Sequence, residues 1–159
     1  MGRAQRNAGE STVDRRVAAT DPHDLARFEQ AQNQDGIYDA AVAELLAGRK
    51  TGHWMWFVFP QMAGLGHSAM SRRYAISSLA EARAYLRHPV LGPRLVECAR
   101  ILSELPGTDA AVVLGGIDAQ KLRSSMTLFH RADPDQPEVA AVLGKYFDGE
   151  PDPETDRRL

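Results

Sequence analysis

The sequence predicts an all-α fold, a compact single domain of about seven or eight helices. Apolar residues recur at helical spacing along most of the chain, and capping residues precede several of these segments. Glycine or proline closes most of them, and no pair of alternating strand-like segments is evident. The 159 residues suit one domain, which at this length can bury a core without disulfides.

The first helices follow from local start and stop signals. Residues 1–20 carry scattered arginines and no apolar signal core, so we expect a disordered leader. Asp21 can cap free N–H groups and Pro22 suits a first helical position, which predicts a helix start. A second helix is predicted over 37–47, stopped by Gly48 and antiparallel to the first.

An aromatic run, residues 54–59, follows these two helices and needs burial. Its consecutive apolar residues suit a buried strand or a buried helix, and periodicity does not separate the two. Because the surroundings are helical, we favour a short helix that ends before Pro60, followed by a loop over 61–67. Three of its aromatic side chains are expected in the core, namely Trp54, Phe57 and Phe59.

The remaining helices are bounded by caps and breakers. Helical patterns cover residues 68–77, 79–87, 90–105, 118–130 and 138–147. Ser68, Ser78 and Asp118 stand where each can cap the following helix, and His88 is expected to cap carbonyls or to pack. Residues 108–114 suit a short capped helix or a lone strand. The folded domain is therefore expected over 21–150, with 151–159 as an acidic surface tail.

Composition excludes several classes of function. The net charge of −2 lacks the basic excess of a nucleic-acid binder, so no nucleic-acid partner is expected. No segment approaches the roughly 18 apolar residues of a membrane span. The single cysteine, Cys98, lies in an apolar helical context and suits a buried hydrophobe in a reducing cytoplasm. The histidines lack metal-ligand spacing, so we expect neither a metal nor another cofactor.

The first candidate site surrounds the aromatic run. Lys50, His53 and Trp54 would share one face if the helix extended back to residue 50. Trp54 or Trp56 could stack on a flat ligand, while Lys50, His53 and Gln61 supply polar groups. The alternative is a core plug whose polar ends bond to the backbone.

The second candidate is the glycine-rich stretch that follows. Backbone N–H groups of Gly64 and Gly66, before a helix that starts at Ser68, could hold an anion. The stretch lacks the Gly-Lys-Ser/Thr ending of a P-loop. The alternative is an ordinary loop with Ser68 as helix cap.

The third candidate lies on the predicted helix over 118–130. Lys121, Ser124 and Ser125 would form a polar face next to Asp118. A serine–lysine pair can supply a nucleophile, but a fixed cation for phosphate or carboxylate is the favoured role for Lys121. The alternative is a helix cap with an exposed ion pair.

Several blocks of the chain resemble a bacterial domain-of-unknown-function family that is numbered 1810, whose members are sometimes mislabelled as calpastatin. The matching blocks are residues 50–61, 64–68, 74–76, 81–82, 85–95 and 118–129. This resemblance spans about residues 24–150 and implies a mainly helical cytoplasmic domain, without a reaction. Members usually carry serine at the position of Gly52 and phenylalanine-glycine at Leu114-Gly115, so a hydroxyl role at position 52 does not carry over.

These features lead to two hypotheses of function. The first is a domain that binds or processes a nucleotide-like or other anionic small molecule, with His53 or Asp118 as the proton-transfer candidate. Small helical domains that process ADP-ribose or NAD derivatives offer a fold-level parallel. The second is a non-enzymatic protein-interaction module with the aromatic run as structural core. Neither the reaction nor the oligomeric state follows from the sequence.

Overall fold

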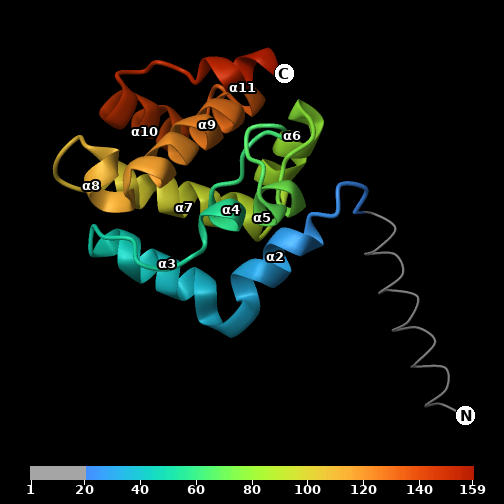
Figure 1. Cartoon of the computed structure of the whole chain (residues 1–159), viewed down its shortest axis with the longest axis horizontal. Helices are drawn as coiled ribbons and strands as arrows, with labels where there is room; N and C mark the ends of the chain where they lie inside the picture. The colour runs from blue at the N-terminus through green and yellow to red at the C-terminus, as the bar shows by residue number, and fades with distance from the viewer. Residues whose placement is uncertain (1–20) are drawn as a thin grey trace, which may run out of the picture.

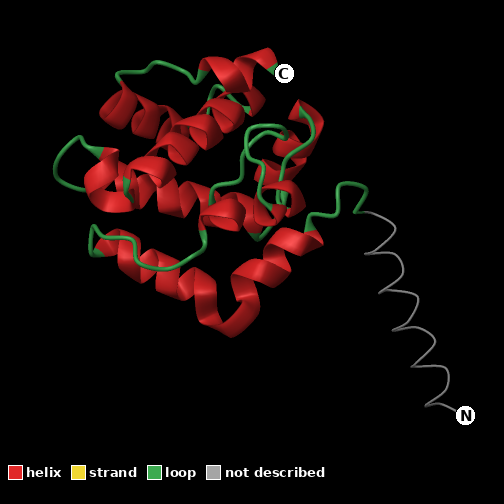
Figure 2. Cartoon of the chain, viewed as in Figure 1, coloured by secondary structure: helices red, strands yellow, loops and turns green. Residues whose placement is uncertain are grey.

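The computed structural model describes residues 21–159, and all regular structure within them is helical apart from one isolated β-bridge between Met62 and Ile76. Figure 2 shows the helices joined by short loops into one compact body. The all-α prediction is therefore confirmed, while the expected leader lies outside the described residues. Within the described part, no helix is both long and apolar enough to cross a membrane.

Helix α7 (Leu91–Glu104) runs through the middle of the domain (Figure 1). It packs against α3 (Ile37–Leu46), α6 (Leu79–Arg87) and α10 (Pro137–Phe147). Contact with three helices leaves most of its apolar stripe buried, because Leu91, Leu95, Cys98, Ala99 and Leu102 are all almost fully covered.

Helix α9 (Gly116–Ala132) is the longest of the described helices and the second organising element. It packs against α6 and α10, and also against α8 (Ala110–Leu114) and α11 (Pro153–Arg157). Residues 108–114, for which a helix or a strand was open, thus contain the short helix α8, and the Asp109 carboxylate caps it by accepting the Ala111 N–H.

The two N-terminal helices form an open V (Figure 1). Helix α2 (Ala26–Asn33) meets α3 through the 3₁₀ turn Gln34–Gly36, in which Asp35 and Gly36 both have positive φ. The two helices touch but diverge from this turn, with α2 packing on α4 and α3 on α7, so they do not lie side by side as the expected antiparallel hairpin. The predicted role of Asp21 at the start of α2 is confirmed, because its two carboxylate oxygens accept the backbone N–H groups of Leu25 and Ala26.

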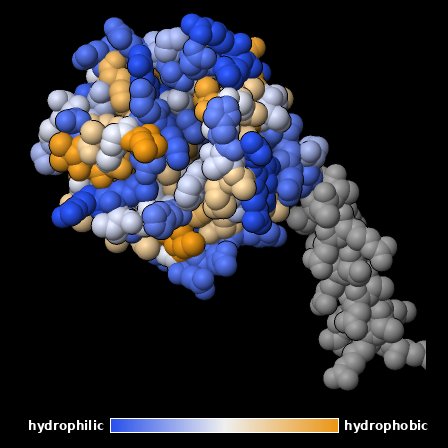
Figure 3. Space-filling model, viewed as in Figure 1, coloured by the Kyte–Doolittle hydropathy of each residue, from blue (hydrophilic) through white to orange (hydrophobic). Residues whose placement is uncertain are grey.

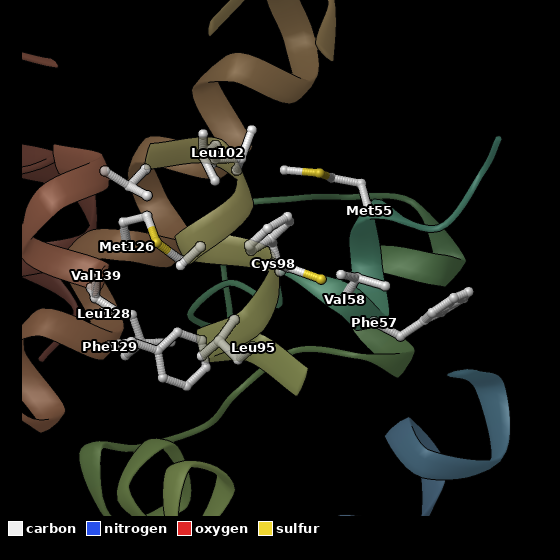
Figure 4. Packing of buried hydrophobic residues seen from close by; sticks show 14 of the residues in the cluster. Met55, Phe57, Val58, Leu95, Cys98, Leu102, Met126, Leu128, Phe129 and Val139 are labelled. Carbon is white, nitrogen blue, oxygen red and sulfur yellow. The ribbon is translucent and has the colours of Figure 1, made fainter. Parts of the chain in front are cut away.

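The aromatic run forms α4 (Met55–Val58), a single turn that ends before Pro60 as predicted. Figure 4 shows Met55 and Val58 directed towards the side chains of α7, whereas the Phe57 ring points away from α7. Phe57 packs edge-on against Tyr74, with 5.3 Å between the ring centroids. Trp54, Phe57 and Phe59 are at most 3% exposed, which confirms their assignment to the core.

Predicted caps explain two of the helix starts. The Ser68 hydroxyl accepts the Ser71 N–H at the start of α5 (Ala69–Arg73), and the Ser78 hydroxyl accepts the Glu81 N–H at the start of α6. His88 behaves differently from the prediction. Its Nδ1 accepts the first N–H groups of α7 instead of donating to carbonyls of α6.

The C-terminal segment is an ordered part of the domain surface. Residues 151–159, expected as an acidic tail, contain α11, and Thr155 within it is fully buried. The Arg131 guanidinium binds both oxygens of Asp156, which holds the pKa of that carboxyl below its usual range. This attachment places the turn before α11 beside the outer face of α9.

Candidate functional site

The loop between α3 and α4 is organised by one carboxylate, Glu44 of α3. Its Oε1 accepts the N–H groups of Thr51 (2.6 Å) and Gly52 (2.7 Å) and the indole N–H of Trp54 (3.1 Å). Partial burial would raise the pKa of Glu44, but donation from Gly52, Thr51 and Trp54 outweighs it and holds the pKa below the usual 4.5. Glu44 therefore fixes the position of Trp54 and of the backbone beside Lys50.

Lys50 is the most enclosed cation of the candidate set, with a side chain that is only 9% exposed. Its Nζ lies 2.8 Å from Asp118 Oδ2, donates to the carbonyl of Gly52 at 2.6 Å, and stands 5.0 Å from the centroid of the Trp54 ring. Its backbone N–H donates to the carbonyl of Val113, which joins this loop to α8. Lys50 thus acts first as a structural link between the loop and α9.

Asp118 connects the two lysines. Its Oδ1 lies 3.7 Å from Nζ of Lys121, which in turn stands 5.1 Å from the centroid of the Trp56 ring. Helix α9 begins at Gly116 and its N-cap residue is Gly115, which offers no side chain, so Asp118 lies in the first turn and the predicted cap is wrong. Its carboxylate is engaged by ammonium groups instead.

Lys121 stands at the wall of a groove of about 410 Å³ between α9, the glycine-rich loop and the C-terminal segment. Four residues of the predicted set line this groove, namely Gln61, Gly66, Lys121 and Ser124. Five further lining residues were not anticipated: Leu65, Ile117, Gln120, Asp152 and Glu154. The groove therefore unites parts of all three candidate sites, whereas Lys50, Trp54 and Trp56 of the first candidate are not among its lining residues.

The remaining candidates lie elsewhere. His53 is exposed and does not line the groove, and the helix α4 starts too late to place Lys50, His53 and Trp54 on one helical face. Ser68 is occupied in capping α5. The Gly64 carbonyl accepts a hydrogen bond from Arg158, which holds the glycine-rich loop against α11.

The two serines of α9 are buried and do not form the predicted polar face. Ser124 donates to a carboxylate oxygen of Asp152 (2.9 Å) and lies near the carbonyl of Gln120, so its hydroxyl serves the attachment of the C-terminal segment. Ser125 is fully buried, and its hydroxyl has no hydrogen-bond partner among the described residues. This placement disfavours a serine–lysine nucleophile.

Gly52 shows why its residue type matters at this position. A Cβ there would stand 3.0 Å from Cδ1 of Trp54 and 3.1 Å from Oε2 of Glu44. A serine, the residue usual at this position in the family that the sequence resembles, would require the indole and the carboxylate to shift. The glycine lets its N–H approach Glu44 closely.

Sequence reasoning missed Glu44 because it lies ten residues before Trp54 and in another element. The available signal was a carboxylate near the end of α3, followed by a loop whose N–H groups at Thr51 and Gly52 lack helical partners. Within residues 21–159, no cluster of three or more histidine, cysteine or acidic side chains could hold a metal ion.

A second groove, of about 600 Å³, is lined by the segment before α2, by α2 itself, and by the end of α6 with the two residues that follow it. Its lining includes His23, Glu29, Arg87 and His88. Glu29 stands 3.5 Å from the Nε2 of His88, whose other nitrogen caps α7. None of the candidate site residues lines this groove.

Comparison with known proteins places the chain in a family. The model of a protein family of unknown function, DUF1810, matches residues 22–159. A crystal structure of the conserved hypothetical protein Rv1873 from Mycobacterium tuberculosis is similar, with 50% identity and a TM-score of 0.84, over 87% of this chain and 98% of that one. No curated protein matches. The chain therefore belongs to the DUF1810 family.

Proposed function

We propose that the groove beside Lys121 binds a small anionic molecule that carries a flat ring, such as a nucleotide. The observation that carries this proposal is the position of Lys121, which lines the groove and whose ammonium stands 5.1 Å from the centroid of the half-buried Trp56 ring. Trp56 itself is not a lining residue, so it would meet a ligand next to the groove. An ammonium group recognises phosphate or carboxylate, and an adjacent indole offers a surface for stacking.

The rest of the lining suits such a ligand. A volume of about 410 Å³ lies within the usual size range of small-molecule sites. Amide groups of Gln61 and Gln120 offer donors and acceptors, and Leu65 and Ile117 supply apolar surface. This mixture of a few polar groups with apolar walls is typical of binding sites for organic ligands.

The acidic residues of the groove do not oppose an anion as strongly as their number implies. Asp152 accepts hydrogen bonds from Ser124 and Thr155, and Glu154 pairs with Arg157 and Arg158. The charge of Glu154 is thus compensated by two arginines, whereas Asp152 is bound only by neutral hydroxyl groups. Lys50 and Lys121 together outweigh Asp118 by one positive charge.

The proposal is restricted to binding. His53 lies outside the groove lining, and Asp118 is held by two ammonium groups, so proton transfer by either residue stays a prediction. An enzymatic step would be indicated only if a bound ligand were converted.

A thermal-shift screen of nucleotides, ADP-ribose and sugar phosphates tests the proposal. A ligand at 100 times its dissociation constant stabilises the fold by about 2.7 kcal/mol, which raises Tm by about 5–11 °C in a chain of this size. Lys121→Met should weaken binding about 10–100-fold, because it removes a charge-assisted hydrogen bond. Trp56→Leu should weaken binding of ring-bearing ligands more than that of sugar phosphates.

Arg100→Met is the matched control for the loss of one positive charge. Arg100 lies on α7, is half exposed and, among residues 21–159, pairs only with Glu104 of its own helix. Binding that survives in Lys121→Met but falls in Arg100→Met would contradict the assignment of the groove.

A protein-interaction module is the second candidate, and exposed apolar side chains favour it. Leu46, Val112 and Ile117 are 63%, 74% and 77% exposed, and they belong to neighbouring elements linked by the hydrogen bond between Lys50 and Val113. Figure 3 shows apolar surface over the α8 end of the molecule. Absence of any stabilising compound across the screen would favour this candidate.

A further inference from the structure

We infer that Asp118 is a built-in competitor for the anion site, a carboxylate that an anionic ligand must displace from Lys121. This inference rests on the proposed function and adds to it a residue that sets the affinity. Asp118 would lower the affinity for anions, which is the opposite of the role expected of an acid or base in catalysis.

The two ion pairs of Asp118 differ in a way that assigns separate tasks to the lysines. Lys50 approaches Oδ2 at 2.8 Å, whereas Lys121 approaches Oδ1 at 3.7 Å, which exceeds a normal hydrogen-bond distance. The Lys50 side chain is 9% exposed and the Lys121 side chain 23%. The weak, more exposed contact is the one that a ligand can replace.

Lys50 can retain Asp118 when Lys121 turns towards a ligand. The Lys50 ammonium also donates to the Gly52 carbonyl and lies over the Trp54 ring, so its position is fixed from three directions. Asp118 therefore keeps one close cation in the ligand-bound state. The exchange breaks only the longer contact of Lys121 and needs no change in α9 or in the loop.

Because Lys121 lines the groove, its ammonium needs to move only a short way from Asp118 to a ligand there. Lys121 lines the groove, while Asp118 and Lys50 do not. Its ammonium also contacts the Trp56 ring, whose face stays available to a cation after the contact with Asp118 is lost. A flexible lysine stem can thus move its charge from Asp118 to a phosphate in the groove.

The test compares AMP with adenosine, its uncharged counterpart, by isothermal titration calorimetry. Asp118→Asn should bind AMP about tenfold more tightly than the wild-type chain, since it removes the carboxylate that competes with the phosphate for the Lys121 ammonium. Adenosine affinity should stay unchanged. In a Lys121→Met background, Asp118→Asn should give little gain for AMP, because the released cation is missing.

In Asp118→Asn the Lys50 ammonium keeps the Gly52 carbonyl and the Trp54 ring, but it loses the carboxylate that balances its largely buried charge. If urea unfolding shows a destabilised variant, Lys50→Met combined with Asp118→Asn removes both members of the close pair and should tighten AMP binding in the same direction. Lys50→Met alone, with Asp118 left to Lys121, should weaken AMP binding.

The outcomes separate this inference from the proposed function. If the wild-type chain binds AMP and Asp118→Asn binds it no more tightly, the competitor role is wrong while the proposed site stands. A gain that persists without Lys121, or an equal gain for adenosine, would also overturn the inference. If neither the wild-type chain nor Asp118→Asn binds AMP or any compound of the screen, the proposed function itself fails.

Discussion

Removing the Glu44 carboxylate tests whether one side chain holds the loop between α3 and α4. In Glu44→Ala the indole N–H of Trp54, in a side chain only 1% exposed, and the Gly52 N–H both lose their acceptor. An unpaired buried donor costs about 1–3 kcal/mol, and water can replace the acceptor most readily at the exposed Thr51 N–H and least at the buried indole N–H of Trp54. We expect a loss of about 3 kcal/mol in the free energy of unfolding, or about 6–12 °C in Tm.

Urea unfolding at pH 7, followed by tryptophan fluorescence and circular dichroism, measures this loss. Glu44→Gln retains an acceptor without its charge and should cost less, about 1 kcal/mol. Glu104→Ala is the control, because the Glu104 side chain is 63% exposed and its one ion pair in the described part of the chain is with Arg100, one turn away. A Glu44→Ala variant within 0.5 kcal/mol of the wild-type chain, about the range of an ordinary surface substitution, would refute the role of Glu44.

The lowered pKa of Glu44 adds a dependence on pH to the same comparison. Because the folded chain holds this carboxyl below its usual pKa of 4.5, the unfolded chain takes up the proton first as the pH falls. The stabilisation is complete above pH 4.5 and disappears as the pH falls through the lower folded value. The difference between the wild-type chain and Glu44→Ala should therefore shrink below pH 4.5, and a constant difference would contradict this.

Three further predictions concern the scaffold. Arg27→Met should lower the free energy of unfolding in urea by about 3 kcal/mol, because the carboxylate of Glu81, a residue only 3% exposed, would lose its cation. Adding Glu81→Gln to Arg27→Met should restore part of this stability, and an Arg27→Met variant as stable as the wild-type chain would contradict the prediction. Burial raises the pKa of the Cys98 thiol to about 12, so iodoacetamide at pH 8 should label it only after unfolding, and rapid labelling of the native chain would contradict its burial. Gly92→Ala should cost about 3 kcal/mol, since the new Cβ would stand 2.0 Å from a backbone carbonyl of α6, whereas Gly144→Ala on α10 meets no atom within 4 Å and should not destabilise.

The fold followed from the sequence where the signals are local. Ser68 and Ser78 cap the predicted helices through their own neighbours, and Pro60 ends the aromatic turn, because each effect acts within a few residues. The start of α9 was misassigned at Asp118, where distant Lys50 competes for the carboxylate that local rules give to the helix N-terminus. Local patterns do not report such a competition.

The candidate site was predicted only in part, because its shape also depends on contacts between residues far apart in the sequence. Residue chemistry singled out Lys121 and Gln61, but their shared groove depends on how the C-terminal segment folds back on α9. That segment is held by Asp152 and Asp156, whose partners Ser124 and Arg131 lie 25 or more residues earlier in the chain. Its acidic, proline-containing composition indicates a surface tail, and only these long-range contacts turn it into a wall of the groove.

Backbone amide NMR during a titration with AMP, or with the most stabilising compound of the screen, tests the proposed site most directly. Binding at the groove predicts shifts at Trp56, at 61–66 and at 117–124, which Lys121→Met should abolish. Saturable shifts confined to the other groove, around His23 and His88, would contradict the assignment of the site, and so would the absence of shifts throughout the chain.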